Sequence, residues 1–147
     1  DMYARVIHTL QIFCFTQDGS SMKIEIKVTN FKLTPAIERY AMEKINSLDR
    51  FIDENLLKQG EDSVVAYIEL AMTTRHHHKG DIFRAEVDVR LPRKVLRAEA
   101  ESSDIKAAID EVRDDLAVEL KKYKEKKESI FKKGSRILKN IFITEEQ

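Results

Sequence analysis

Basic side chains gather at three separate places in this 147-residue chain, and their common chemistry is the neutralisation of anions such as phosphate. The three clusters are Arg75 to Lys79, the pair Arg93-Lys94 with Arg97, and the lysine run that begins at Lys121. Each phosphate that a Lys or Arg neutralises releases condensed counterions, so affinity for RNA falls as salt rises. The clusters favour RNA binding; for the terminal run alone, ordinary solvated surface is the alternative.

The formal net charge of zero hides a strong separation of charge along the chain. Residues 119–139 hold nine Lys or Arg against three Glu, whereas residues 99–118 hold two Lys or Arg against seven Asp or Glu. Local fields govern encounters with polyanions. Base-stacking aromatics are scarce, because Tyr67 and Tyr123 fit the core pattern, so we expect shape and phosphate contacts to dominate.

Other chemistries find little support in the sequence. The run His76-His77-His78 cannot easily direct three rings at one ion, and no Cys, Asp or Glu at a familiar ligand spacing completes a site, so we expect neither a metal nor a cofactor. Ser102 and Ser103 are better explained as helix caps than as nucleophiles, and the sequence has no glycine-rich phosphate loop or nucleophile elbow. We therefore expect no enzyme; the histidines add partial positive charge to their loop.

Length and composition suit one domain with a highly charged surface. The single cysteine, Cys14, permits no internal disulfide and fits a reducing cytoplasm. No apolar run approaches the roughly 20 residues that span a bilayer.

The elements that position the basic clusters follow from hydrophobic periodicity. Alternation predicts strands from Met22 to about Val28, over 64–73, over 82–91 and over 94–101. Three- and four-residue spacing predicts helices from Pro35 to about Phe51, capped by Thr34, and from Ser103 to about Glu128. The chain is thus predicted to be α+β, in the order β-α-β-β-β-α, with two helices on one face of one four-stranded sheet.

Two segments flank this domain, which we place at residues 22–128. Residues 1–21 are predicted to be an N-terminal extension outside the native domain, although their apolar piece from Leu10 to Phe15 is able to pair as an extra strand. Residues 129–147 form a basic amphipathic tail, and three behaviours remain open for it: folding back on the domain, pairing with another copy, or ordering on a partner.

Extended patterns over most of the domain resemble a known family. The residues that carry the resemblance are MKIEIKVTNFKLTPAIERYAMEKINSLDRFID at 22–53, GDIFRAEVDVRLP at 80–92, KVLRAEAES at 94–102 and DIKAAIDEVRDDLAVELKKYKEKKE at 104–128. They are similar to the ribosome hibernation promoting factors and ribosome-associated inhibitors of bacteria and plastids. The resemblance implies a layout like that of double-stranded-RNA-binding domains.

The resemblance also implies a function and a set of contacts. Family members lodge in the small ribosomal subunit, in the channel used by messenger RNA and by the anticodon ends of transfer RNAs, where occupancy blocks translation and protects idle ribosomes. Carried over by position, the candidates for contact with ribosomal RNA are Arg75, His78, Lys79, Arg84, Arg90, Arg93, Lys94, Lys121, Lys122, Lys124, Lys126 and Lys127.

Long members of the family carry a further C-terminal domain that pairs two ribosomes. Only about nineteen residues follow Glu128 in this sequence, which is too few for that domain, so we expect a short-form factor that binds single ribosomes in the cytoplasm. The rival readings are a general double-stranded-RNA binder and a self-associating interaction module that binds no RNA.

Overall fold

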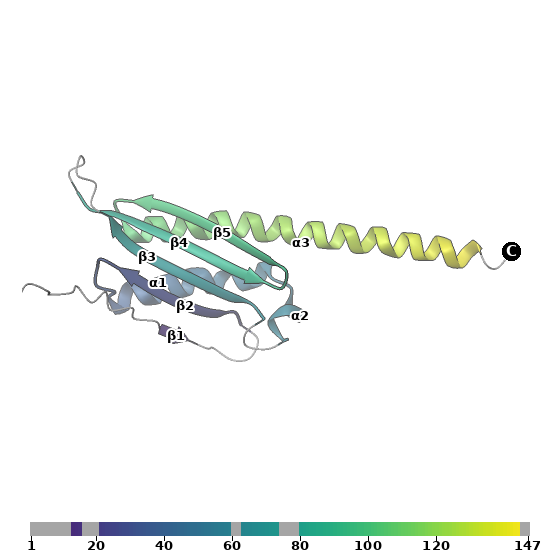
Figure 1. Ribbon diagram of the computed structural model, residues 1–147, viewed down its shortest axis with the longest axis horizontal. Helices are drawn as coiled ribbons and strands as arrows, with labels where there is room; N and C mark the ends of the chain where they lie inside the picture. Colours follow the sequence, from purple (N-terminus) through teal and green to yellow (C-terminus); the bar gives the residue numbers. More distant parts are fainter. Residues whose placement is uncertain (1–12, 16–20, 60–62, 74–79, 145–147) are drawn as a thin grey trace, which may run out of the picture.

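The computed structural model describes residues 13–15, 21–59, 63–73 and 80–144. Its elements, in chain order, are β1 (Phe13–Phe15), β2 (Lys23–Thr29), α1 (Pro35–Asn46), the 3-10 helix η1 (Ser47–Phe51), α2 (Glu54–Leu57), β3 (Val65–Thr73), β4 (Ile82–Leu91), β5 (Lys94–Ser102) and α3 (Ile105–Thr144). The predicted order β-α-β-β-β-α is confirmed (Figure 1), and the structure adds the short elements β1, η1 and α2 to it.

The strands form one sheet in the order β1-β2-β3-β4-β5. β2 and β3 run parallel, joined by the crossover through α1 that a parallel pair requires, and the remaining neighbours are antiparallel. The short strand β1 pairs with β2 at the sheet edge, where Phe13 lies opposite Ile26. The four predicted strands therefore form the body of the sheet, and the apolar piece of the N-terminal extension contributes a fifth.

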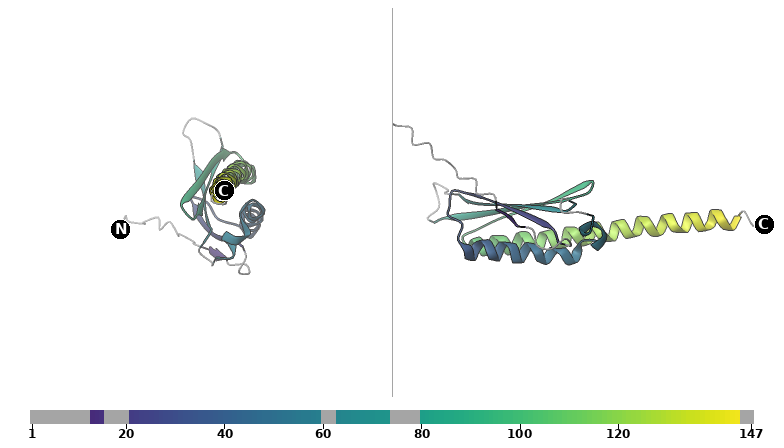
Figure 2. Two further views of the ribbon diagram at one scale, coloured as in Figure 1. Left: turned by 90° about the vertical axis from the view of Figure 1, so that its right-hand side faces the viewer. Right: turned by 90° about the horizontal axis from the view of Figure 1, so that it is seen from below.

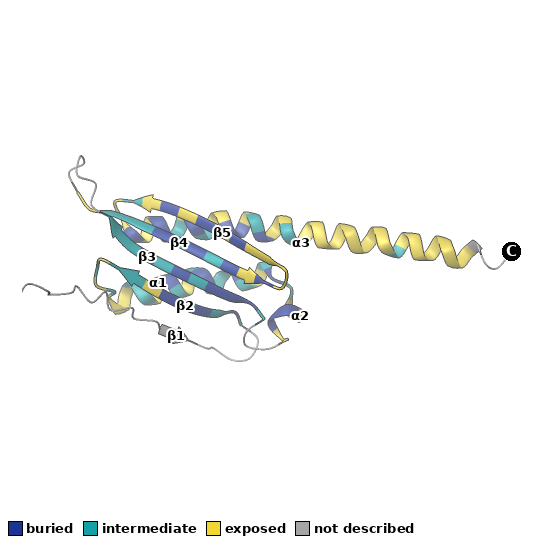
Figure 3. Cartoon of the chain, in the orientation of Figure 1, coloured by how far each residue is buried: buried dark blue, intermediate teal, exposed yellow. Residues whose placement is uncertain are grey.

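Helices α1 and α3 lie side by side across one face of the sheet (Figures 1 and 2). The alternating apolar residues of the strands point at these helices, as predicted: Ile26 on β2 is 1% exposed and Val87 on β4 is 2% exposed. Leu116 of α3 is fully buried against them. Figure 3 shows that the buried residues lie on the strands and on the part of α3 that packs against the sheet. Burial of each such side chain contributes about 1.5–3 kcal/mol.

Both helices begin at side-chain caps. Thr34 Oγ1 accepts a hydrogen bond from the Ile37 amide at 3.3 Å, with Pro35 at the first helical position, as predicted. At α3 the cap is Asp104, whose Oδ1 accepts from the Lys106 amide at 3.1 Å. The prediction that Ser102 or Ser103 caps this helix is wrong, because the helix begins at Ile105 and the residue before it is Asp104. Ser102 Oγ accepts a hydrogen bond from the Asp104 amide at 3.3 Å and so holds the cap residue in place.

A polar brace holds α1 against α3 at the start of the long helix. The Tyr40 hydroxyl donates to Asp110 Oδ1 at 2.7 Å, and Lys44 Nζ lies 3.2 Å from the same oxygen. The hydrogen bond to Asp110 raises the pKa of Tyr40. Burial alone would raise the pKa of Asp110, but the hydrogen bonds from Tyr40 and Lys44 lower it. The brace therefore links α1 to the first half of α3.

α3 continues as one 40-residue helix to Thr144 and projects beyond the sheet (Figure 1). The predicted helix end near Glu128 is therefore wrong. The helix passes through Gly134, because a glycine costs only about 1 kcal/mol relative to alanine inside a helix, and residues 129–144 contain no proline. At 1.5 Å per residue the helix is about 60 Å long.

Candidate nucleic-acid interface

Arg93 stands at the tip of the hairpin that joins β4 to β5. The two-residue turn places Pro92 at its first central position and Arg93 at its second, where the φ angle of Arg93 is 73°. This pattern is typical of a type II turn, which ordinarily has glycine at the second position. The left-handed conformation costs a residue with a Cβ about 1–2 kcal/mol. The exposed guanidinium of Arg93 is therefore held at the hairpin tip at a conformational cost.

The hairpin lies beside the point at which α3 leaves the sheet (Figure 1). Lys94 Nζ lies 5.7 Å from the centroid of the Tyr123 ring on α3. A cation at this distance from a ring face is attracted by the ring quadrupole. Because Tyr123 is half-buried against the core, this contact joins the hairpin to the helix.

A second ring, Phe51 at the end of η1, gathers two further cations at the same end of the molecule. Lys121 Nζ lies 4.9 Å from its centroid, and the guanidinium carbon of Arg50 lies 4.6 Å from it. Sequence analysis did not select Arg50. Its position directly before Phe51 was visible, but only the packing of η1 against α3 brings it near Lys121.

Lys127 is anchored to the domain by an acidic partner. Its Nζ lies 3.6 Å from Asp53 Oδ2, and Asp53 also caps α2 by accepting the Asn55 amide at 3.0 Å. The hydrogen bond from Asn55 is the main cause that lowers the pKa of Asp53, with contributions from Lys127 and Lys124. Asp53 therefore stays ionised near neutral pH and partly offsets the lysines around it.

The lysines at the helix exit do not share one face. Lys122 pairs with Glu119 at 3.0 Å, Lys124 borders a hollow of about 710 Å³ that is also lined by Asp53 and Glu54, and Lys126 is exposed. Successive residues turn by about 100° around a helix, so lysines at positions 121, 122, 124, 126 and 127 surround it. We call the following cations the basic end: Arg50, Arg93, Lys94, Lys121, Lys122, Lys124, Lys126 and Lys127.

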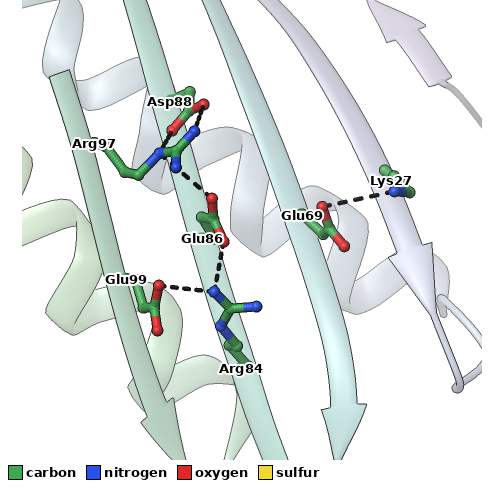
Figure 4. Close-up of polar contacts among 7 residues, drawn as sticks. All are labelled: Lys27, Glu69, Arg84, Glu86, Asp88, Arg97 and Glu99. Atoms are coloured by element: carbon green, nitrogen blue, oxygen red, sulfur yellow. Dashed lines mark hydrogen bonds and ion pairs between the residues drawn. The ribbon is translucent and has the colours of Figure 1, made fainter. Parts of the chain in front are cut away.

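Arg84 lies elsewhere, on the face of the sheet that the helices leave open (Figure 4). Its Nη2 lies 2.7 Å from both Glu86 Oε2 and Glu99 Oε2. Neighbouring Arg97 donates to both oxygens of Asp88, at 2.7 and 2.8 Å. The guanidinium of Arg84 is thus already bonded to two carboxylates, and its predicted RNA contact stays a prediction.

These ion pairs shift the acid–base behaviour of the open face. The hydrogen bond from Arg97 lowers the pKa of Asp88, and the hydrogen bond from Arg84 lowers the pKa of Glu99. Conversely, the hydrogen bonds to Asp88 and to Glu99 raise the pKa values of Arg97 and Arg84, respectively. Lys27 and Glu69 form a further pair at 3.7 Å on β2 and β3. The open face therefore balances its charges locally.

Arg90 sits on the open face near the hairpin. Its guanidinium carbon lies 4.5 Å from the centroid of the Tyr67 ring. Both residues border a shallow hollow of about 270 Å³ that also contains Glu69 and Asp88. Arg90 is exposed, so it remains available to a partner that approaches the hairpin from this face.

The remaining predicted contacts, Arg75, His78 and Lys79, lie outside the described residues. The strands on either side of them, β3 and β4, pair from Thr73 with Ile82 at that end to Val65 with Arg90 at the other. At about 3.3 Å per residue, a ten-residue strand separates its two ends by roughly 30 Å. The structure thus unites the hairpin with the helix exit and places the anchors of the histidine loop at the opposite end of the sheet.

Metal sites and membrane spans are two other features that the described residues could form. Within the described ranges, no group of three or more His, Cys, Asp or Glu side chains is arranged to hold a metal ion. Among the helices that the structure describes, none combines the length and the apolar composition needed to cross a membrane.

Comparison with known proteins identifies relatives of this chain. A ribosome hibernation promotion factor of Lactococcus lactis is 34% identical over 105 residues, which are 70% of this chain and 50% of that protein. A protein of the same name from Staphylococcus aureus is 28% identical over 103 residues, 70% of this chain and 48% of that protein. The chain thus spans about half the length of the curated relatives it matches.

Solved structures and family comparison agree with this result. The N-terminal domain of Thermus thermophilus Protein Y is similar in structure, with a TM-score of 0.54 and 29% identity, over 70% of this chain and 98% of that domain. Residues 24–128 match the family described as "Sigma 54 modulation protein / S30EA ribosomal protein". This range holds nearly all of β2, strands β3 to β5, helix α1, the packed portion of α3 and the basic end, and leaves out β1. The predicted family is confirmed: the chain belongs to the Sigma 54 modulation protein / S30EA ribosomal protein family, whose members include ribosome hibernation promotion factors.

Proposed function

We propose that this protein is a cytoplasmic ribosome hibernation factor that binds the small ribosomal subunit in the channel used by messenger RNA and transfer RNA. Bound there, it inhibits translation by occupancy and stabilises idle ribosomes. Its binding needs no cofactor, and its contacts are with ribosomal RNA and ribosomal proteins. The names of the Lactococcus and Staphylococcus relatives support the hibernation role.

The observation that carries the proposal is the arrangement of cations at the basic end. The five exit lysines point in several directions around one helix, so a flat surface reaches only some of them. A partner that reaches most of them must enclose the helix on more than one side. A channel with RNA walls has this shape and supplies phosphates on each side.

The chemistry of the basic end favours phosphate contact over base reading. Its two rings, Phe51 and Tyr123, are half-buried and already covered by cations, so neither is free to stack on a base. Phosphate contacts position a protein on RNA without carrying sequence information. Shape complementarity to the channel must therefore supply the selectivity.

Co-sedimentation with purified small subunits at increasing salt tests this proposal. If roughly six cations neutralise phosphates, the logarithm of the association constant falls with a slope of about −5 against the logarithm of salt concentration. Changing Lys121→Gln together with Lys124→Gln removes two of these contacts. We expect binding at least tenfold weaker and a slope reduced by about 2.

A matched double variant controls for the loss of charge. Lys32→Gln with Lys106→Gln removes two exposed lysines away from the basic end, before α1 and in the first turn of α3. We expect this variant to bind almost as well as the unchanged protein. Equal weakening by both double variants would show that only net charge matters, and the proposed binding surface would be wrong.

A general duplex-RNA binder is the second candidate, favoured by the absence of any uncovered stacking ring at the basic end. That function predicts comparable affinity for any A-form duplex of sufficient length. The proposed function predicts saturable binding to small subunits that a large excess of duplex RNA displaces only weakly.

A further inference from the structure

The part of α3 beyond the sheet carries a stripe of large apolar side chains with nothing against them. Their exposed fractions lie between 52% and 75%, whereas Val112, Leu116 and Leu120 of the same helix are buried under the sheet. The stripe consists of Ile130, Phe131, Ile137, Leu138, Ile141 and Phe142. No segment among the described residues covers it, so in water this surface favours a partner.

The stripe continues the face of α3 that already packs on the protein. Val112, Leu116 and Leu120 are buried under the sheet, and the same three- and four-residue spacing leads through half-buried Tyr123 to Ile130 and Ile137. The first half of this face is covered by protein. Continuity of the pattern indicates that protein also covers the second half.

Gly134 lies in the middle of the stripe, between Ile130 and Ile137. Inside a helix it costs about 1 kcal/mol relative to alanine, and a Cβ built on it meets no atom within 4 Å. Nothing else in the described chain therefore requires a glycine at this position. A second helix that crosses here gains close backbone approach from the missing side chain.

The charges of this segment favour an antiparallel over a parallel orientation of such a second helix. Residues 129–144 contain four Lys or Arg and no Asp or Glu, and the basic residues lie mostly on the side opposite the stripe. In a parallel pair, basic residues would lie level with their own copies. In an antiparallel pair centred on Gly134, Lys133 and Lys139 of one copy come level with Ser135 and Ser129 of the other, and the only basic residues that come level with each other are Lys132 and Arg136.

We propose that a second copy of this chain covers the stripe, with the two projecting helices antiparallel and crossing near Gly134. Ile130 then faces the second copy's Leu138, and Phe131 faces its Ile137. The pairing is symmetric, as in most homodimers. The basic sides point away from the contact into solvent.

The free length of the helix and the size of the stripe both fit this arrangement. Lys127 still contacts the domain through Asp53, and α3 projects beyond this point to Thr144; the midpoint of residues 128–144 lies within two residues of Gly134. If each of the six side chains buries about 100 Å², the two copies bury on the order of 1,200 Å². That area is at the lower end for specific interfaces.

Sedimentation velocity of the full chain, freed of nucleic acid, tests the proposal. We expect a monomer–dimer equilibrium in the micromolar range. Ile137→Glu places a charge in the stripe of both copies, so we expect the dimer dissociation constant to rise about 100-fold or more. The matched control is Ile143→Glu, because Ile143 follows Ile141 by two residues and lies on the opposite side of the helix.

A protein that stays monomeric at about 0.5 mM would overturn the proposal. Equal effects of Ile137→Glu and Ile143→Glu on the dissociation constant would overturn it as well. Vesicles with anionic headgroups provide a rival partner, since a basic amphipathic helix also suits a lipid surface. Binding to such vesicles by a protein that does not dimerise would assign the stripe to lipid.

Disulfide trapping tests the direction of the pair in a Cys14→Ser background. Antiparallel crossing brings the two copies of residue 134 together, so Gly134→Cys should yield a linked dimer under mild oxidation. Ile141→Cys should not, because the two copies of this stripe residue lie at opposite ends of the antiparallel contact, about 20 Å apart. Efficient trapping of both variants would indicate a parallel pair and contradict the proposal. None of these measurements involves ribosomes, so their failure leaves the proposed function untouched.

Discussion

Arg93, which we propose contacts phosphate, has a backbone conformation that is unfavourable for a residue with a Cβ. The turn between β4 and β5 requires the positive φ of this residue. The same turn places the guanidinium at the edge of the basic end. Such strain persists where the surrounding structure determines it and often accompanies function. The two demands on Arg93 are separable by substitution.

Arg93→Gly should separate stability from binding. Glycine adopts positive φ without steric cost but loses more chain entropy on folding, so we expect the free energy of unfolding to stay equal or to rise by up to about 1 kcal/mol. Affinity for small subunits should fall, because one phosphate contact is lost. Urea denaturation and co-sedimentation measure the two effects. Arg93→Lys serves as the charge-preserving control; a parallel loss of stability and binding in Arg93→Gly would contradict this account.

Asp49 is a carboxylate whose partial burial within the described chain is unfavourable. Its carboxyl is partly buried, accepts the Met22 amide, and leaves Oδ1 without a hydrogen-bond partner among the described residues. Burial raises the pKa of Asp49. A carboxyl whose pKa is higher in the folded state favours folding at low pH, and this benefit is lost as pH rises through the folded-state pKa.

Asp49→Asn should therefore stabilise the protein near pH 7. The amide oxygen can still accept the Met22 amide, and the charge is removed, so we expect a gain of up to about 1 kcal/mol. The gain should shrink as the solution is made acidic, because wild-type Asp49 then becomes neutral too. Urea denaturation at pH 7 and below pH 4 measures this; a destabilised variant at pH 7 would show that the charge is compensated.

Among the secondary-structure elements, the two faces of the sheet have different roles. The helix-covered face holds the core, and the open face holds ion pairs that join β4 to β5 through Arg97 with Asp88 and Arg84 with Glu99. The pKa values of Asp88 and Glu99 are lowered in the folded state. Their contribution to stability is therefore present above their unfolded-state pKa values and is lost as pH falls through the folded-state values.

Arg97→Gln should reduce this sensitivity to acid. We expect the variant to be less stable than the unchanged protein near pH 7 and nearly equal to it once Asp88 is protonated at strongly acidic pH. Thermal unfolding across this pH range measures the difference. Because Arg97 lies outside the basic end, its loss should leave subunit binding almost unchanged. A pH-independent difference in stability would mean that Arg97 acts through packing instead.

Sequence periodicity was a good guide to the elements themselves. Strand β4 was predicted at its observed bounds because five apolar residues alternate with charged ones from Phe83 to Leu91. The end of α3 was predicted too early, because the residues after Glu128 were assigned to a separate tail although their apolar side chains recur at helical intervals. The cap at Asp104 was not predicted, because Ser102, Ser103 and Asp104 are adjacent and each is a residue type that caps helices.

At the scale of the whole molecule, the site was only partly visible in the sequence. The exit lysines were evident as a run, but their meeting with Lys94 depends on the length of β5 and on the packing of Tyr123. Arg50 was missed, because its nearness to Lys121 arises from contacts of η1 with α3. Arg84 was selected as an outward cation, yet strand register supplies it with Glu99 from fifteen residues away.

Competition with messenger RNA and initiator transfer RNA tests whether the protein binds in the decoding channel, as we propose. Small subunits would be incubated with the protein at fixed salt, with and without messenger RNA and initiator transfer RNA, and the bound fraction measured by co-sedimentation. We expect saturable binding of the protein, and we expect messenger RNA and initiator transfer RNA to exclude it. Saturable binding that is unaffected by messenger and transfer RNA would place the basic end elsewhere on the ribosome and contradict the account.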